Sequence, residues 1–166
     1  MCRKNVRGFT LIELLIVVGI IGILAAIAVP NLLSAVQRAK QKRTMADIRT
    51  IAGAWEAREV DMTRYNAAGW SMLGFPVEHS QLTGAIYPTY LRKVPSVDGW
   101  GNPWAIATSA AWSGPGRAHA YQIVSGGRDG AISPTTESGP TTHFDCDIVY
   151  QEGAFLLYPE GVQTGK

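Results

Sequence analysis

The sequence has few of the residues that enzyme and metal sites commonly use. Its 166 residues include two cysteines, Cys2 and Cys146, and three histidines. His79, His119 and His143 are too far apart for the ligand spacing of a structural zinc site. The two cysteines lie on opposite sides of a long apolar segment. A disulfide between them would need both ends of that segment in one compartment, and we reject it.

Charge is also sparse, at 17 % of the residues with a formal net charge of +2. Three basic residues, Arg3, Lys4 and Arg7, precede the apolar segment. Without residues 1–8 the chain has 12 basic and 13 acidic side chains. This near balance gives no reason to expect a nucleic acid partner. The apolar content of 46 % excludes a disordered tail.

Charge is nearly absent from residues 9–29 (FTLIELLIVVGIIGILAAIAV), where Glu13 is the one charged residue. As a helix this segment spans about 31 Å, close to the hydrocarbon thickness of a bilayer. A secretory signal peptide instead has a short apolar core followed by small residues at a cleavage site. Residues 25–28 (AAIA) could imitate such a cleavage site, so a secretory signal peptide stays an alternative. The basic leader predicts a cytoplasmic N-terminus and an exported C-terminal part.

The residues that open the apolar segment carry a specific motif. Residues 8–13 (GFTLIE) resemble the processing site of type IV pilins and of the pseudopilins of type II secretion. The resemblance implies that a prepilin peptidase removes residues 1–8 by cleaving after Gly8. It also implies N-methylation of Phe9, which becomes the mature N-terminus. Residues 9–29 would then be the transmembrane and assembly helix.

Glu13 is the unusual residue of this segment. A carboxylate inside hydrocarbon is unfavourable unless it is paired or neutralised. One interpretation is that Glu13 reaches the headgroups, since it lies only five residues into the segment. The other is that it pairs with the α-amino group of Phe9 on a neighbouring subunit, as the assembly of the resembled family implies. That pair would align subunits in register.

Three residues weaken the apolar helix. Gly19 and Gly22 lower helix propensity, and Pro30 removes a backbone donor. The resemblance implies that the segment near Pro30 kinks or melts when subunits enter a filament. The alternative is that the glycines are packing points in the membrane.

Residues 30–65 continue as a helix with two apolar faces. The first half is expected to face other subunits, and Ile48 to Trp55 to cover its own domain. Arg38, Lys40, Lys42 and Arg43 lie between the two faces. These basic residues either pair with acidic residues of neighbours or form a solvated face.

Residues 66–166 predict a small head. We expect a short helix at Gln81 to Leu91 and a hairpin turn at 150–154. Strands are expected at Trp104–Thr108, Ala120–Ser125, Cys146–Tyr150 and Ala154–Tyr158, and loops at 109–117 and 125–142. The fold class is therefore α+β. In terms of the resemblance it is a pilin fold, a long helix packed on a small antiparallel sheet.

Three segments of the head appear in a recognisable order: DGWGNPW at 98–104, SGGRDG at 125–130 and DCDI at 145–148. This order is similar to that of the major pseudopilins of type II secretion. Two features depart from them: residues 132–143 form a longer segment, and the C-terminal YQEGAFLLYPEG extends beyond the usual short ending.

The resemblance also implies a calcium loop, for which Asp129 and Asp147 are the first candidates and Asp145 the weaker one. Calcium takes six to eight oxygen ligands, which carboxylates and backbone carbonyls can supply. On a strand, Asp145 and Asp147 would share a face, and Cys146 would point the other way. The alternative is that Asp129-Gly130 is a turn and the other carboxylates are solvated.

The resemblance implies a structural filament subunit with no catalytic residue: the major pseudopilin of a type II secretion system, forming a periplasmic pseudopilus through its N-terminal helix. Implied partners are copies of itself, prepilin peptidase, the inner-membrane assembly platform, minor pseudopilins and membrane lipid. The subunit would be a single-pass inner-membrane protein before assembly. The alternative is a type IVa major pilin that forms a surface pilus for adhesion, twitching or DNA uptake.

Two other classes compete with a filament subunit. An enzyme would use Cys146 with His143 or His119 as its base, but nothing here resembles an active-site signature. A membrane-tethered binding domain that never polymerises would gain nothing from the acid at Glu13. Both interpretations are therefore weaker than the filament.

Overall fold

The computed structural model describes residues 8–62, 75–109, 120–133 and 138–164. The chain divides into two compact units, with the boundary between Val36 and Gln37. Helix α1 (Leu11–Met62) contributes residues to both units. The predicted leader, apart from Gly8, lies outside the described residues.

The first unit contains the apolar half of α1. Its large apolar side chains, from Leu11 to Val36, are exposed, as expected for a segment whose solvent is lipid or other subunits. The helix is long and apolar enough to cross a membrane, with a mean hydropathy of 2.9 over a stretch of 18 residues. It continues through Pro30 without interruption. One turn after Ile27, the side chain of Asn31 donates to the Ile27 carbonyl at 3.2 Å.

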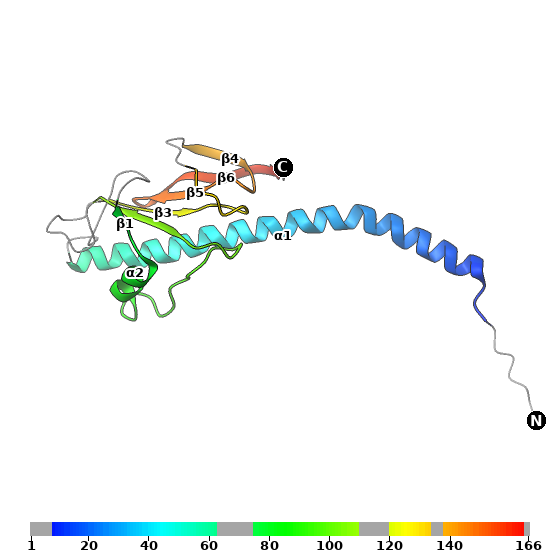
Figure 1. The fold of residues 1–166 in the computed structure, drawn as a ribbon, viewed down its shortest axis with the longest axis horizontal. Helices are drawn as coiled ribbons and strands as arrows, with labels where there is room; N and C mark the ends of the chain where they lie inside the picture. Colours follow the sequence, from blue (N-terminus) through cyan, green and yellow to red (C-terminus); the bar gives the residue numbers. More distant parts are fainter. Residues whose placement is uncertain (1–7, 63–74, 110–119, 134–137, 165–166) are drawn as a thin grey trace, which may run out of the picture. The chain divides into compact units, whose positions relative to one another are not determined.

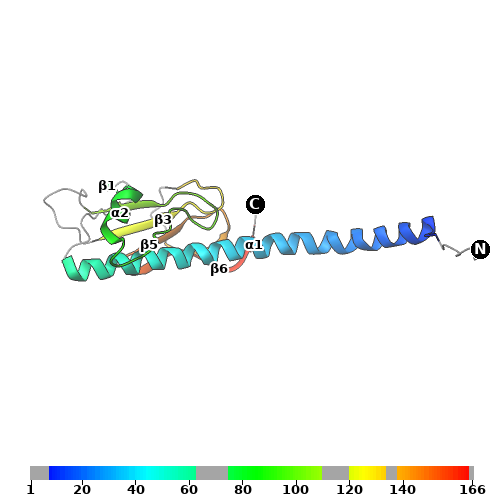
Figure 2. The same cartoon turned by 90° about the horizontal axis from the view of Figure 1, so that it is seen from below.

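The second unit packs the rest of α1 against a sheet, as Figures 1 and 2 show. The described residues form a six-stranded sheet in the order β1-β2-β3-β5-β6-β4. Its strands are β1 (Phe75–Pro76), β2 (Ala105–Thr108), β3 (Tyr121–Ser125), β4 (Gly139–His143), β5 (Ile148–Gln151) and β6 (Ala154–Thr164). A short helix, α2 (His79–Ile86), follows β1. The predicted α+β class is confirmed.

The strand pairing sorts side chains onto two faces. Ile106 pairs with Ile123 across β2 and β3, and Ile123 pairs with Tyr150 across β3 and β5. These side chains join the core formed with α1, which contributes the fully buried Ile48, Ile51, Ala52 and Trp55. The prediction that Ile48 to Trp55 cover one sheet face is therefore confirmed. The opposite face carries a second apolar group of Val124, Val149 and Leu157.

The sheet differs from the prediction in one pairing. The β1–β2, β2–β3, β3–β5 and β5–β6 pairs are antiparallel, as expected, but β4 runs parallel to β6. The sheet is therefore mixed. Strand β4 falls in a segment predicted as loop, because its sequence GPTTH has a glycine, a proline and no alternating apolar residues. At the sheet edge its place depends on backbone pairing with β6, which tolerates proline.

Other bounds shift by a few residues. Helix α2 begins and ends earlier than predicted, and β6 extends to Thr164. Asp145, Cys146 and Asp147 lie in the connection between β4 and β5 rather than on a strand. The expectation that Asp145 and Asp147 share a strand face is therefore wrong, since a turn does not alternate its side chains. The predicted helix end near residue 65 lies outside the described residues.

The C-terminal strand is fastened to α1 by amide side chains. The Nε2 of Gln41 donates to the Oε1 of Gln163 at 3.1 Å, and both residues are buried. The Nε2 of Gln163 in turn donates to the carbonyls of Thr141 and Glu160, at 2.6 and 2.8 Å. This bonding holds β6, and through it β4, against the helix.

Candidate functional site

The start of α1 forms a self-contained polar cap. Thr10 stands at the N-cap and donates its backbone N–H and its hydroxyl to Oε2 of Glu13, at 2.9 and 2.7 Å. The Glu13 N–H donates back to the Thr10 hydroxyl at 3.3 Å. This is the capping-box arrangement, in which two residues three apart satisfy each other's free groups. The pattern Thr-x-x-Glu could have revealed Thr10 from sequence.

The processing residues lie just outside that cap. Gly8 and Phe9 are exposed and precede α1. In the unprocessed chain the nitrogen of Phe9 is in a peptide bond with Gly8, so it has no α-amino group for Glu13 to pair with. The carboxylate of Glu13 is then held by Thr10 alone among the described residues. Pairing with Phe9 of a neighbour stays a prediction that cleavage would make chemically available.

A second site fastens the head to the helix. Asp98 is 2 % exposed, and its Oδ1 accepts the backbone N–H groups of Trp100, Gly101 and Asn102, each at 2.9 Å. Its Oδ2 accepts the hydroxyl of Ser125 at 2.7 Å. One carboxylate therefore closes the DGWGN turn and ties it to the end of β3. The repeated Gly and Asn after Asp98 are a turn signal that could have identified it.

This turn then contacts α1. The N–H of Gly99 donates to the Thr44 hydroxyl at 2.9 Å, and Nε1 of Trp100 donates to Oε1 of Gln37 at 2.6 Å. A Cβ on Gly99 would lie 2.3 Å from the carbonyl oxygen of Lys40, so only glycine allows this approach. The DGWGNPW segment, one of the three that resemble the pseudopilins, therefore forms hydrogen bonds that attach the head to α1.

The third site contains the calcium candidates. Oδ1 of Asp129 accepts the N–H of Ala131 at 3.0 Å, and Oδ2 of Asp147 accepts the N–H of Ser133 at 2.9 Å. Asp147 is buried. Burial raises the pKa of the Asp147 carboxyl above its ordinary value; the hydrogen bond from Ser133 opposes this effect, and the negative charge of Asp129 adds to it. Burial and the nearby negative charge disfavour the ionised form of Asp147. A bound cation would offset this cost.

Asp145 has a different partner. Its two carboxylate oxygens accept from Nε and Nη2 of Arg128 at 2.6 and 2.7 Å, which is a bidentate ion pair. The hydrogen bond to Asp145 raises the pKa of Arg128. Gly127, with φ of +64°, lets the chain turn here, where a Cβ would lie 2.7 Å from the Cys146 carbonyl. Asp129 is therefore near enough for its charge to affect Asp147, whereas Asp145 forms an ion pair with Arg128.

The chemistry of this loop limits what it could hold. Within the described residues, no three His, Cys, Asp or Glu side chains gather as a metal site. A cation would need backbone carbonyl oxygens beside the carboxylates of Asp129 and Asp147, and calcium accepts such ligands. Calcium at this loop therefore stays a prediction, with Asp129 and Asp147 as the two carboxylate ligands that it would use.

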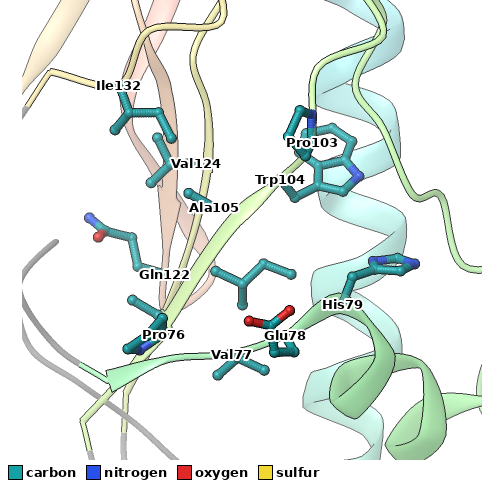
Figure 3. Close-up of a pocket in the computed structure, with 12 residues that line it drawn as sticks. Pro76, Val77, Glu78, His79, Pro103, Trp104, Ala105, Gln122, Val124 and Ile132 are labelled. Atoms are coloured by element: carbon teal, nitrogen blue, oxygen red, sulfur yellow. The ribbon is translucent and has the colours of Figure 1, made fainter.

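A cavity of about 440 Å³ lies on the sheet beside α2 (Figure 3). Glu78, His79 and Trp104 line it on one side, and Gln122 and Val124 on the other. His79 shares a hydrogen bond of 3.2 Å with Thr83 through Nε2, and Glu78 stands at the N-cap of α2. Glu78 and His79, the titratable groups among the described residues that line the cavity, therefore belong to the local structure of α2.

The residues of the enzyme alternative have structural partners where the structure describes them. Nδ1 of His143 shares a hydrogen bond of 2.9 Å with the Thr164 hydroxyl. Cys146 donates its backbone N–H to the His143 carbonyl at 3.3 Å, and its thiol is free and half-buried. His119 lies outside the described residues. The His143–Thr164 bond fastens the end of β4 to the end of β6.

A long apolar helix with a polar cap at its start and a small α+β head defines a pilin-like filament protein. In agreement, residues 3–29 match the prokaryotic N-terminal methylation motif. Residues 31–141 match the family described as type II secretion system protein G. The chain belongs to this family, and the resemblance read from the sequence is confirmed.

Individual relatives agree. The chain is 30 % identical over 145 residues to the type II secretion system core protein G of Klebsiella michiganensis, covering 86 % of this chain and 97 % of the relative. It is 35 % identical over 136 residues to that of Pseudomonas aeruginosa, covering 78 % and 89 %. It is also 36 % identical over 109 residues to the type IV wide pilus major component PilA4 of Thermus thermophilus, covering 63 % and 83 %. No solved structure matches the chain significantly.

Proposed function

We propose that this chain is the major structural subunit of a type II secretion pseudopilus and that it has no enzymatic activity. The observation that carries the proposal is the exposed apolar half of α1 joined to a head of the protein G family. An apolar helix face this extensive is unfavourable in water and must be covered by lipid or by other helices. In a filament, the apolar helices of neighbouring subunits would cover this face.

The N-terminal motif supports a processing step. Cleavage after Gly8 by a prepilin peptidase would free the α-amino group of Phe9, which is then N-methylated. The subunit would lie in the inner membrane with its N-terminus cytoplasmic before this step. The basic leader, the exposed Gly8 and Phe9, and the match to the methylation motif support this order of events.

During assembly, Glu13 would exchange its hydrogen bonds with Thr10 for an ion pair with a neighbouring subunit. In the single chain its carboxylate is capped by Thr10. In the filament it would pair with the α-amino group of Phe9 of a neighbour, since a charge pair in apolar surroundings is better than an unpaired charge. The assembly platform, minor pseudopilins and a cytoplasmic ATPase would act on subunits in this state.

Calcium is proposed as a structural ion of the head. Asp129 and Asp147 would hold it together with backbone carbonyls of the same loop, and its charge would neutralise the two neighbouring carboxylates. Asp145, already paired with Arg128, is proposed to position the loop rather than to bind the ion.

A surface pilus is the second candidate function, favoured by the similarity to the wide pilus component of Thermus thermophilus. Electron microscopy of surface-sheared material, with mass spectrometry of the subunit, separates the two. A chain that begins at N-methylated Phe9, with no long surface fibres and with failed exoprotein secretion on deletion, supports the pseudopilus. Long surface fibres of the same processed chain would establish the pilus. An unprocessed Met1 would overturn both.

A further inference from the structure

A groove of about 470 Å³ lies between α1 and the segment that precedes the DGWGN turn. Three helix residues, Arg43, Asp47 and Thr50, line one side. Residues 93–97 (KVPSV) line the other, and they include the apolar side chains of Val94, Pro95 and Val97. Val97 is 37 % exposed, so part of this apolar lining is open to solvent. We call this feature the basic groove, because Arg43 and Lys93 line it.

Among the described residues that line the groove, two carry a positive charge and one carries a negative charge. The side chain of Arg43 is 67 % exposed, and Lys93 is exposed. Asp47 is the acid, and it lies 3.4 Å from Arg43 one helical turn away. Surface pairs of this kind are weak, so Arg43 remains available to a stronger partner. The groove therefore suits an apolar side chain that is flanked by carboxylates.

The chain carries such a feature at the end of α1. Val60 is 75 % exposed, although it lies in the half of the helix that packs on the sheet. Its neighbours in sequence are Glu59, which is half-buried, and Asp61, which is exposed. Asp61 accepts the hydroxyl of Tyr90 at 2.7 Å, which holds its carboxylate in place. We call Glu59–Asp61 the acidic knob.

The knob and the groove of one chain cannot meet. Thr50 at the groove and Val60 lie ten residues apart on one helix, which is about 15 Å along its axis. Two complementary features at different positions on one subunit make a heterologous contact, and such contacts build open helical filaments. A second copy of this chain therefore supplies the complement of each feature.

We propose that the acidic knob of one subunit docks into the basic groove of the next. Val60 packs against Val94, Pro95 and Val97, while Glu59 and Asp61 face Lys93 and Arg43. The apolar contact contributes affinity, and the charges select the register. This inference rests on the proposed filament function and names a contact between the heads, separate from the contacts of the apolar helices.

Cysteine cross-linking tests the contact. Val60→Cys and Val97→Cys are combined in one chain that also carries Cys146→Ser, and fibres are oxidised before denaturing electrophoresis. A disulfide needs the two Cα atoms within about 7 Å. We expect a ladder of covalent multimers from the Val60/Val97 pair. The matched control pairs Val60→Cys with Val162→Cys, since Val162 is 81 % exposed but lies in β6. Fibres without a ladder, or an equal ladder in the control, would overturn the contact.

Charge reversal provides a second test of the contact between the knob and the groove. It applies even if the cysteine variants form no fibres. Lys93→Glu and Glu59→Lys should each reduce fibre yield, and the double variant should recover it. Single variants with wild-type yield would overturn the contact, and so would cross-links from Val60→Cys to a secreted protein instead of to another subunit. If wild type forms no fibres and its deletion leaves secretion intact, the proposed function itself is wrong. The two failures are therefore distinguishable.

Discussion

Oδ2 of Asp98 accepts the hydroxyl of Ser125 at 2.7 Å, and both residues are buried. Asp98 opens the DGWGN turn, and Ser125 ends β3 and begins the SGGRDG segment. This one bond therefore connects the turn that contacts α1 with the loop that carries the calcium candidates. Two of the three head segments that resemble the pseudopilins are therefore joined in space by this contact.

Asp98→Ala should destabilise the head by about 3–5 kcal/mol, because it leaves three backbone N–H groups and the Ser125 hydroxyl without their acceptor. Urea unfolding of the full chain in detergent measures this. Ser125→Ala removes one of these bonds and should cost less, about 1 kcal/mol. Equal losses from the two variants would contradict the central role of Asp98.

Gly99→Ala should weaken the packing of the DGWGN turn against α1 and lower the stability of the head. Its Cβ would overlap the Lys40 carbonyl, and we expect a loss of about 1–3 kcal/mol. Gly53→Ala is the control, since Gly53 lies in α1, the helix that the turn contacts, and its Cβ would meet nothing within 4 Å. The control should gain about 0.5–1 kcal/mol from higher helix propensity. Thermal unfolding of both variants would show shifts of opposite sign, and a neutral Gly99→Ala would refute the steric argument.

Glu13→Gln should leave the protein in the membrane and sharply reduce filament formation. The amide keeps the size of the side chain and removes the charge that would pair with the α-amino group of Phe9. Membrane fractionation and fibre yield measure the two outcomes separately. Thr10→Ser keeps the hydroxyl of the cap and should assemble as wild type does. Normal fibre yield from Glu13→Gln would refute the pairing.

Calcium should raise the melting temperature of the full chain in detergent, and a chelator should reverse the effect. Asp147→Asn should abolish this dependence, because it removes one of the two carboxylates proposed to hold the ion. Asp145→Asn breaks the ion pair with Arg128 and should lower stability while it keeps the response to calcium. A response that survives Asp147→Asn would remove that residue from the site.

Alkaline pH should destabilise the head through Tyr150. Burial, and next the charge of Glu56, raises the pKa of the Tyr150 phenol above its ordinary value of 10.0. The folded chain therefore holds this proton more tightly than the unfolded chain. Stability is fully present below the unfolded pKa and falls as pH rises through the folded one. Tyr150→Phe should flatten the fall above pH 10 in urea unfolding, whereas Tyr87→Phe, at an exposed position, should not.

Much of this protein could be predicted from local patterns. The apolar segment from Phe9 to Val29 has one charge and helical composition, so its structure does not depend on distant residues. The alternating strands that became β2, β3 and β5 carry apolar residues that must face a core. The helical period of Ile48, Ile51, Ala52 and Trp55 identified the face that meets the sheet.

The misses have a common cause. Strand β4 has no apolar alternation, and its position comes from pairing with β6, which follows it by a whole strand and two connections. Asp145 belongs to a turn rather than a strand because Arg128 and Gly127 close the loop around it. No short-range pattern contains these pairings, since they join residues that are distant in sequence.

The sequence by itself determined the processing motif, the membrane-length helix, the polar Glu13 within it and the α+β class. Each depends on a short run of residues, on composition, or on a period of two or 3.6 residues. Only the tertiary structure assigned a separate structural role to each aspartate of the head. Asp98 closes a turn, Asp145 pairs with Arg128, and Asp147 lies buried near the charge of Asp129. The three are chemically alike, and their differences come from the partners that long-range folding places beside them.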